Sequence, residues 1–130
     1  MGLKTLLGFG LAVLIVLVAV FWYFSPSNAP GQYDNFAKCL TQKGAKFYGA
    51  WWCPHCAEQK EIIGNSMKYV NYIECSLPDR SDIYQVCKDA DIKGFPTWIF
   101  ADGTRESIVL SLNALSQKTG CSLTGNSTTG

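Results

Sequence analysis

Residues 48–61 read YGAWWCPHCAEQKE, and the two cysteines in this stretch decide the fold and the chemistry that we expect. Cys53 and Cys56 lie three residues apart, and Pro54 between them is a residue that favours the first position of a helix. Free backbone N–H groups and the helix dipole stabilise a thiolate at such an N-terminus. We therefore expect a redox-active Cys53–Cys56 disulfide, with Cys53 as the attacking thiol and Cys56, one turn further on, as the more buried resolving thiol.

The residues between the cysteines fit this chemistry. Pro54 fixes the first turn of the helix, and His55, if protonated, adds positive charge beside the thiolate. A stabilised thiolate favours the reduced form, so the disulfide becomes a stronger oxidant. Three other interpretations remain open: a structural disulfide, a zinc half-site that includes His55, and a surface histidine without a role. The metal site is disfavoured because the sequence has no second histidine.

A second motif, GFPT over residues 94–97, precedes an apolar strand. Pro96 is a candidate for a cis peptide bond, and the backbone groups of Phe95 could pair with an extended substrate. An ordinary trans proline at a strand edge is the alternative. We place Trp52, Phe95 and Thr97 along a substrate groove beside Pro96 and the cysteine pair.

Helices and strands alternate along the rest of the domain. Asp34 is expected to cap a first helix that Gly44 ends, and Ser111 to cap a last helix that ends at Gly120. Between them we expect strands over 45–50, 70–75, 97–101 and 105–110, and helices from Pro54 to Asn65 and over 82–90. The order predicts an α/β sandwich with a small mixed sheet, in which the first two strands are parallel and the last two form a hairpin.

Together with YIEC (72–75) and IKGFPTW (92–98), the cysteine stretch resembles the thioredoxin superfamily. It resembles in particular the thioredoxin-like domain associated with bacterial and plant homologues of vitamin K epoxide reductase, and CPHC is similar to the site of the oxidase DsbA. The likeness covers nearly all of residues 35–121. It implies a thioredoxin-like fold, a cis Pro96, Cys53 as the exposed nucleophile and Cys56 as the resolving thiol. It also implies disulfide exchange with exported protein thiols and reoxidation by a quinone-linked membrane enzyme.

The chain departs from this pattern in two respects. The multi-helix quinone-reducing module is not found in the sequence, so we expect the vitamin K epoxide reductase-like partner to be a separate protein. Many thioredoxins also carry a buried acid six residues before the first cysteine, where this chain has Phe47. The proton acceptor for Cys56 is therefore not identified.

Four cysteines remain for other bonds. Cys75 ends a strand and Cys87 lies in the next helix, so a bond between them would close a loop of about a dozen residues, and the resemblance supports that pair. A bond from Cys39 to Cys121 would then join the first helix to the end of the domain. Buried free thiols, or a second redox pair that relays electrons to the partner, are the alternatives.

The N-terminal stretch has a different composition. The whole chain has a net charge of +1, yet no charged residue occurs between Lys4 and Asp34. The apolar run over residues 6–24 would reach about 28 Å as a helix. We expect residues 1–24 to be a transmembrane signal anchor, 25–34 a proline-rich linker, 35–121 the thioredoxin-like domain and 122–130 a disordered tail. A cleaved signal peptide is the alternative.

These features predict a protein thiol–disulfide oxidoreductase that acts mainly as an oxidase. It would be a single-pass protein of the cell membrane with its domain on the extracytoplasmic, periplasmic side. It would need no cofactor besides the Cys53–Cys56 disulfide, no metal, and, given its balanced charge, no nucleic acid. A reductase or isomerase, for example in cytochrome maturation, and a redox-inert binding module with structural disulfides are the alternatives.

Overall fold

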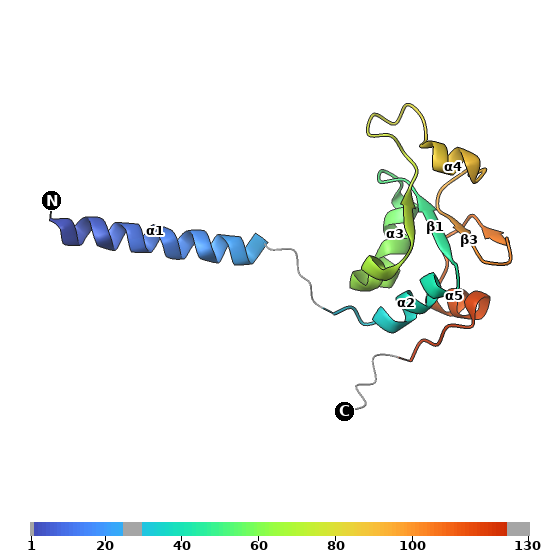
Figure 1. The fold of residues 1–130 in the computed structure, drawn as a ribbon, viewed down its shortest axis with the longest axis horizontal. Helices are drawn as coiled ribbons and strands as arrows, with labels where there is room; N and C mark the ends of the chain where they lie inside the picture. Colours follow the sequence, from blue (N-terminus) through green and yellow to red (C-terminus); the bar gives the residue numbers. More distant parts are fainter. Residues whose placement is uncertain (1, 25–29, 125–130) are drawn as a thin grey trace.

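The computed structural model describes residues 2–24 and 30–124 (Figure 1). Helix α1 (Leu3–Phe24) comes first, and the α/β domain follows. In the part of the chain that is described, no helix is long and apolar enough to cross a membrane, so the expected transmembrane anchor and single-pass location are wrong.

The domain is built on a four-stranded sheet with the order β2-β1-β3-β4. β1 (Lys46–Gly49) pairs in parallel with β2 (Tyr72–Glu74), and the chain between them forms α3 (Pro54–Ile63) and the 3₁₀ helix η1 (Gly64–Tyr69). β1 also pairs antiparallel with β3 (Thr97–Ile99), which forms a hairpin with β4 (Arg105–Glu106). The predicted mixed α/β sheet, with its parallel crossover and its antiparallel hairpin, is confirmed.

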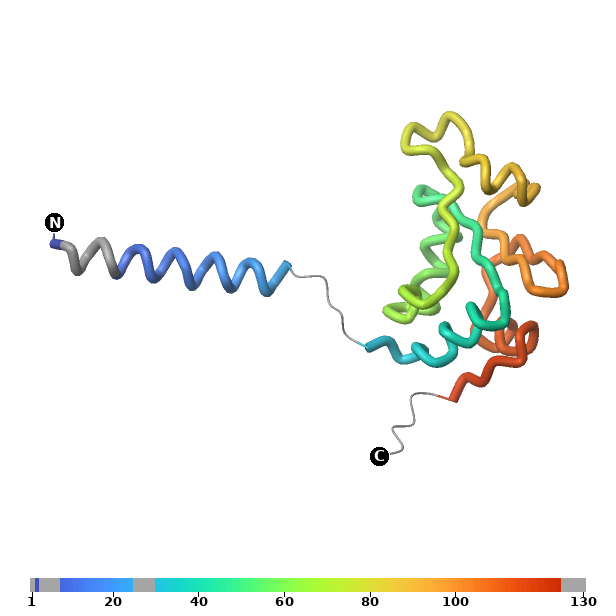
Figure 2. The backbone as a smooth tube through the Cα atoms, in the orientation of Figure 1, coloured from blue at the N-terminus to red at the C-terminus, as the bar shows by residue number. Residues whose placement is uncertain are grey.

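Three more helices complete the domain: α2 (Asp34–Gln42), α4 (Gln85–Asp89) and α5 (Leu112–Thr119). The backbone tube in Figure 2 shows α4 and the loop before it at one end of the domain and α2 with α5 at the other. A disulfide bond joins Cys121, which follows α5, to Cys39 in α2. The core lies between these helices and the sheet, and Trp98 at its centre stacks against Phe47 and Phe100 with ring centroids 4.9 and 6.4 Å away.

A buried glutamine joins α3 to the far side of this core. Gln59 is fully buried, and its side-chain oxygen accepts hydrogen bonds from the indole N–H of Trp98 (3.1 Å) and the backbone N–H of Leu110 (2.7 Å). Its amide nitrogen donates to the Leu110 carbonyl at 3.0 Å. Because each of these groups is satisfied, the polar side chain can be buried, and it fixes the position of α3 against β3.

Several expected boundaries are corrected by the structure. Each strand is shorter than predicted, because a strand extends only as far as its residues pair with a neighbouring strand. Helix α4 covers only part of the predicted range 82–90. Asp34 is the first residue of α2 and not its cap: its Oδ1 accepts from the Gly31 N–H (3.1 Å) and the Ser66 hydroxyl (2.8 Å). Ser111 does cap α5, by accepting from the Ala114 N–H, and Gly120 ends that helix.

The predicted linker and tail are only partly described. Residues 25–29 of the linker and 125–130 of the tail lie outside the described residues. At the start of the tail, Leu123 packs against the core, and the Thr124 N–H donates to the Ser122 hydroxyl at 3.2 Å. The core contacts of the domain therefore continue at least to Leu123.

Candidate active site

The cysteine pair lies at the N-terminus of α3. Cys53 is the N-cap residue with extended backbone angles, φ −81° and ψ 120°, and Pro54 is the first helical residue. A proline fits this position because it lacks the N–H that would have no partner in the helix. Both thiols are free, with Cys53 7% exposed and Cys56 1% exposed. The outer thiol is therefore the one that an attacking group reaches first.

The loop before β3 faces Cys53. The Phe95–Pro96 peptide bond is cis, and the Phe95 carbonyl oxygen lies 3.7 Å from Cys53 Sγ. This distance is within reach of a weak S–H···O hydrogen bond. The structure thus brings together the two motifs that the sequence places about 40 residues apart.

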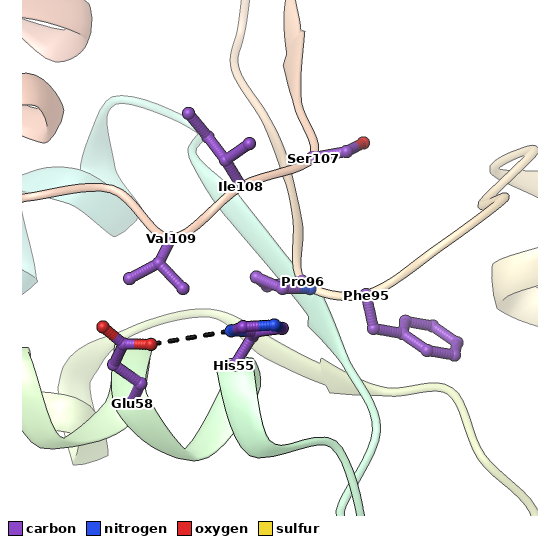
Figure 3. A pocket seen from close by; sticks show the side chains of 7 residues that line it. All are labelled: His55, Glu58, Phe95, Pro96, Ser107, Ile108 and Val109. Atoms are coloured by element: carbon purple, nitrogen blue, oxygen red, sulfur yellow. Dashed lines mark ion pairs between the residues drawn. The ribbon is translucent and has the colours of Figure 1, made fainter.

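A cavity of about 350 Å³ lies beside this contact. In Figure 3 His55 and Glu58 rise from α3 toward Pro96 and Val109, while the Phe95 ring points away from them. The imidazole Nδ1 is 3.6 Å from a Glu58 carboxylate oxygen, and both side chains are largely exposed. The complete lining consists of His55, Glu58, Phe95, Pro96, Ser107, Ile108 and Val109.

The sequence had not singled out Glu58 or the segment 107–109 for this wall. Ile108 is 58% exposed and follows the short strand β4. The sequence feature that could have indicated this wall is an apolar residue directly after a hairpin, because large apolar side chains in contact with water often mark binding surfaces.

Two residues that the sequence assigns to the groove lie elsewhere. Thr97 is 3% exposed, and its hydroxyl donates to the Gly94 carbonyl at 2.8 Å and lies 3.0 Å from the Ser107 hydroxyl. Trp52 is 42% exposed, and its indole N–H donates to the Ser76 hydroxyl at 2.7 Å. Its ring packs edge-on against Phe95 with centroids 6.2 Å apart, outside the cavity lining.

Cys56 lies in a different environment from Cys53. The pKa of the Cys56 thiol is raised to about 12, chiefly by burial and also by the neighbouring Cys53, whereas a backbone hydrogen bond with Ala50 and the charge of Lys60 oppose the shift. A thiol of this kind is protonated at neutral pH. Any reaction that passes through Cys56 must therefore move a proton.

The side chains next to Cys56 come from β1 and β2. A Cβ built on Gly49 would lie 3.1 Å from Cys56 Sγ and 3.1 Å from the Tyr72 hydroxyl, so thiol and phenol border the same small space. The Tyr72 hydroxyl donates to Glu74 Oε2 at 2.6 Å. Glu74 Oε1 accepts from the N–H groups of Trp51 (3.1 Å) and Ser76 (2.8 Å).

Sequence reasoning missed Tyr72, Glu74 and Lys60. The first two alternate along β2, so they share one side of a strand that runs parallel to β1 and ends beside the cysteine pair. That spacing within YIEC was the available signal. The Lys60 ammonium group lies 3.9 Å from the centre of the Tyr72 ring.

The other four cysteines form two disulfides, Cys75–Cys87 and Cys39–Cys121. All but Cys39 of these residues are at most 1% exposed, and the two bonds lie in different parts of the domain. Within residues 2–24 and 30–124 no group of three histidine, cysteine or acidic side chains could hold a metal ion.

Comparison with known proteins supports the redox chemistry. No family model matches the chain. Over 92 residues the chain is 47% identical to thiol-disulfide oxidoreductase LTO1 of Arabidopsis thaliana, an alignment that covers 67% of this chain. The chain corresponds to only 24% of the length of that relative. The similarity and the paired cysteines support a relationship to the thioredoxin-like redox proteins and an oxidoreductase enzyme.

Proposed function

We propose that the chain is a thiol–disulfide oxidoreductase that works mainly as an oxidase of protein thiols, such as those of exported proteins. One observation carries the proposal. Cys53 sits at the N-terminus of α3, 7% exposed and 3.7 Å from the Phe95 carbonyl, while Cys56 is buried one turn further on. This is the arrangement that a reactive thiol and its resolving partner need. The only cofactor that the reaction requires is the disulfide itself.

Oxidation of a substrate proceeds in two exchanges. A substrate thiolate attacks Cys53 Sγ of the Cys53–Cys56 disulfide, and Cys56 leaves as a thiolate that takes up a proton. A second substrate thiolate then attacks the substrate sulfur of the mixed disulfide, and Cys53 leaves as a thiolate. The substrate loses two electrons and gains a disulfide, and the enzyme ends with two reduced cysteines.

The position of Cys53 supports the proposed direction of exchange. Cys53 lies at the N-terminus of α3, and the helix dipole and free N–H groups at such a position generally favour a thiolate and so the reduced form of a cysteine pair. The His55 ring adds positive charge at the same end of the helix when it is protonated. A pair that prefers to be reduced passes its disulfide on to substrates.

The reduced pair must be reoxidised before the next turnover. We assign this step to a separate, vitamin K epoxide reductase-like enzyme that passes the two electrons to a quinone. The support for this partner is the resemblance of the cysteine, YIEC and IKGFPTW stretches to the domains associated with such enzymes. Phe95 and the cavity beside Pro96 are the surface that we propose for substrates and partner alike.

The reduction potential of the Cys53–Cys56 pair tests the direction. Equilibration of the full chain with glutathione buffers should give a value well above about −200 mV, toward the −120 mV of strong oxidants. A value near −270 mV, that of thioredoxin, would instead indicate a reductase.

Substrate capture tests the function itself. In the Cys56→Ala variant the mixed disulfide between Cys53 and a substrate cannot be resolved from within the enzyme, so it should accumulate on incubation with an oxidised protein substrate. Cys53→Ala is the matched control and should trap nothing. Equal trapping by both variants would refute the assignment and favour a redox-inert binding module.

A further inference from the structure

Each turnover of the proposed oxidase requires a proton to move at Cys56, and this inference rests on that function. Cys56 is 1% exposed, so bulk water does not reach its sulfur freely. Phe47, which is buried on β1, offers no ionisable group for the transfer. A group that holds the proton must therefore lie among the side chains that border Cys56.

The described residues offer one route away from the thiol. Cys56 Sγ and the Tyr72 hydroxyl border the same space at Gly49, and the Tyr72 hydroxyl donates to Glu74 at 2.6 Å. Burial raises the pKa of the Tyr72 phenol, and the hydrogen bond to Glu74 and the charges of Glu74 and the cysteines raise it further. Tyr72 therefore keeps its proton at neutral pH and can pass one on only as it receives another.

Glu74 is held in place by its second oxygen. Oε1 accepts the backbone N–H groups of Trp51 and Ser76, so Oε2 points at Tyr72. Lys60 lies over the Tyr72 ring from α3, and its charge favours the Cys56 thiolate. The titratable groups around the route are thus Cys53, Cys56 and Lys60 from the α3 region and Tyr72 and Glu74 from β2.

We propose that Glu74, acting through the hydroxyl of Tyr72, accepts and returns the proton of Cys56 in each catalytic cycle. When Cys56 attacks Cys53, its S–H proton passes to the Tyr72 oxygen while the Tyr72 proton passes to Glu74 Oε2. The Cys53–Cys56 bond forms, the group bound to Cys53 leaves with the electron pair, and Glu74 becomes a neutral acid. When a substrate later opens the disulfide, the proton returns along the same route to the Cys56 thiolate.

The reaction of the reduced full chain with the aromatic disulfide 5,5′-dithiobis(2-nitrobenzoate) isolates this step. Cys53 first attacks the reagent and releases one thionitrobenzoate. Cys56 then attacks Cys53 and releases a second one, while the Cys53–Cys56 disulfide forms. Because thionitrobenzoate is a stable anion that needs no proton on leaving, the proton that moves in the second phase is that of Cys56.

Glu74→Gln keeps the oxygen that binds the two N–H groups but removes the base, and Tyr72→Phe keeps the ring but removes the relay. Both variants should slow the second phase by about tenfold or more and leave the first phase within about twofold. In Glu74→Gln the second phase should then rise about tenfold per pH unit, because hydroxide replaces the carboxylate, whereas the wild-type profile is flatter. Glu61→Gln, on the exposed face of α3, is the matched control and should behave as wild type.

Two results would overturn the relay. Second phases with wild-type rates and wild-type pH profiles in both variants would show that the proton leaves by another path. Equal slowing of both phases would show that Glu74 only supports the turn that carries Cys53. A different result would refute the proposed function itself. The wild-type chain would then release only one thionitrobenzoate, as Cys56→Ala does, and this result would also refute the relay.

Discussion

At the scale of single residues, the two cysteines of one motif differ because one turn of helix separates surface from core. Cys53 keeps 7% of its surface at the N-cap of α3, whereas Cys56 keeps 1% and packs beside Gly49. Gly49 is required by this packing, since a Cβ there would lie 2.8 Å from a Tyr72 ring carbon. Any side chain at position 49 would separate the thiol from the phenol.

The buried Cys56 thiol makes the stability of the reduced protein depend on pH. Its pKa in the folded protein, about 12, lies above its ordinary value of 9.0, so the unfolded chain releases the proton first as pH rises. The contribution of Cys56 to stability is therefore complete below about pH 9 and declines from there toward about pH 12. Urea unfolding of reduced wild type and Cys56→Ala should give a difference in free energy that shrinks over this window.

The comparison with Cys56→Ala removes the effects of other groups that titrate at high pH. A difference between the two proteins that stays constant from pH 8 to 11 would contradict the raised pKa. A difference that grows with pH would mean that the folded protein favours the thiolate.

At the scale of elements, β2 and α4 are joined by a disulfide that closes the loop over 76–84. Cys75 and Cys87 are both fully buried, and the same loop holds Ser76, which accepts the indole N–H of Trp52. The Arg80 guanidinium lies 4.6 Å from the centre of the Trp51 ring. The loop is thereby attached to the residues that precede the cysteine pair.

Removing this bond should cost stability but not the chemistry of the site. The sequence separation of 12 predicts a loss of about 3 kcal/mol in the free energy of unfolding of Cys75→Ala/Cys87→Ala, measured in urea. The two-phase reaction with the aromatic disulfide should persist. Loss of the second phase at unchanged stability would instead identify Cys75–Cys87 as a redox relay.

At the scale of the whole molecule, the second disulfide joins the beginning of the domain to its end. Cys39 lies in α2 and Cys121 follows α5, 82 residues later. Near it, the Ser116 hydroxyl donates to the Cys121 carbonyl at 2.6 Å, and Leu123 packs on the core. These contacts secure both ends of the domain to one sheet.

The longer loop predicts a larger effect. Cys39→Ala/Cys121→Ala should lose about 4 to 5 kcal/mol, because this bond restricts far more of the unfolded chain than Cys75–Cys87 does. The same urea titration applied to both double variants gives the comparison. A smaller loss than that of Cys75→Ala/Cys87→Ala would mean that the unfolded chain is already compact near its ends.

The sequence by itself determined the mixed α/β architecture and the place of the cysteine pair, because both depend on local patterns. Proline after Cys53 starts α3, alternating apolar runs form strands, and Asp102-Gly103 makes the hairpin turn. The local order and the resemblance together supported the pairing of Cys75 with Cys87, and the structure has that bond. The transmembrane assignment was wrong, since no helix in the described part of the chain is long and apolar enough to cross a membrane.

Only the tertiary structure decided what surrounds each thiol. The Phe95 carbonyl faces Cys53, and Thr97 turns into the interior. Tyr72 comes from the parallel neighbour of β1 to border Cys56, and its hydroxyl donates to Glu74. These contacts join residues that are distant in sequence, and the register of three strands sets them. Local patterns predict which elements form, but a proton route from a buried thiol exists only where packing brings separate strands together.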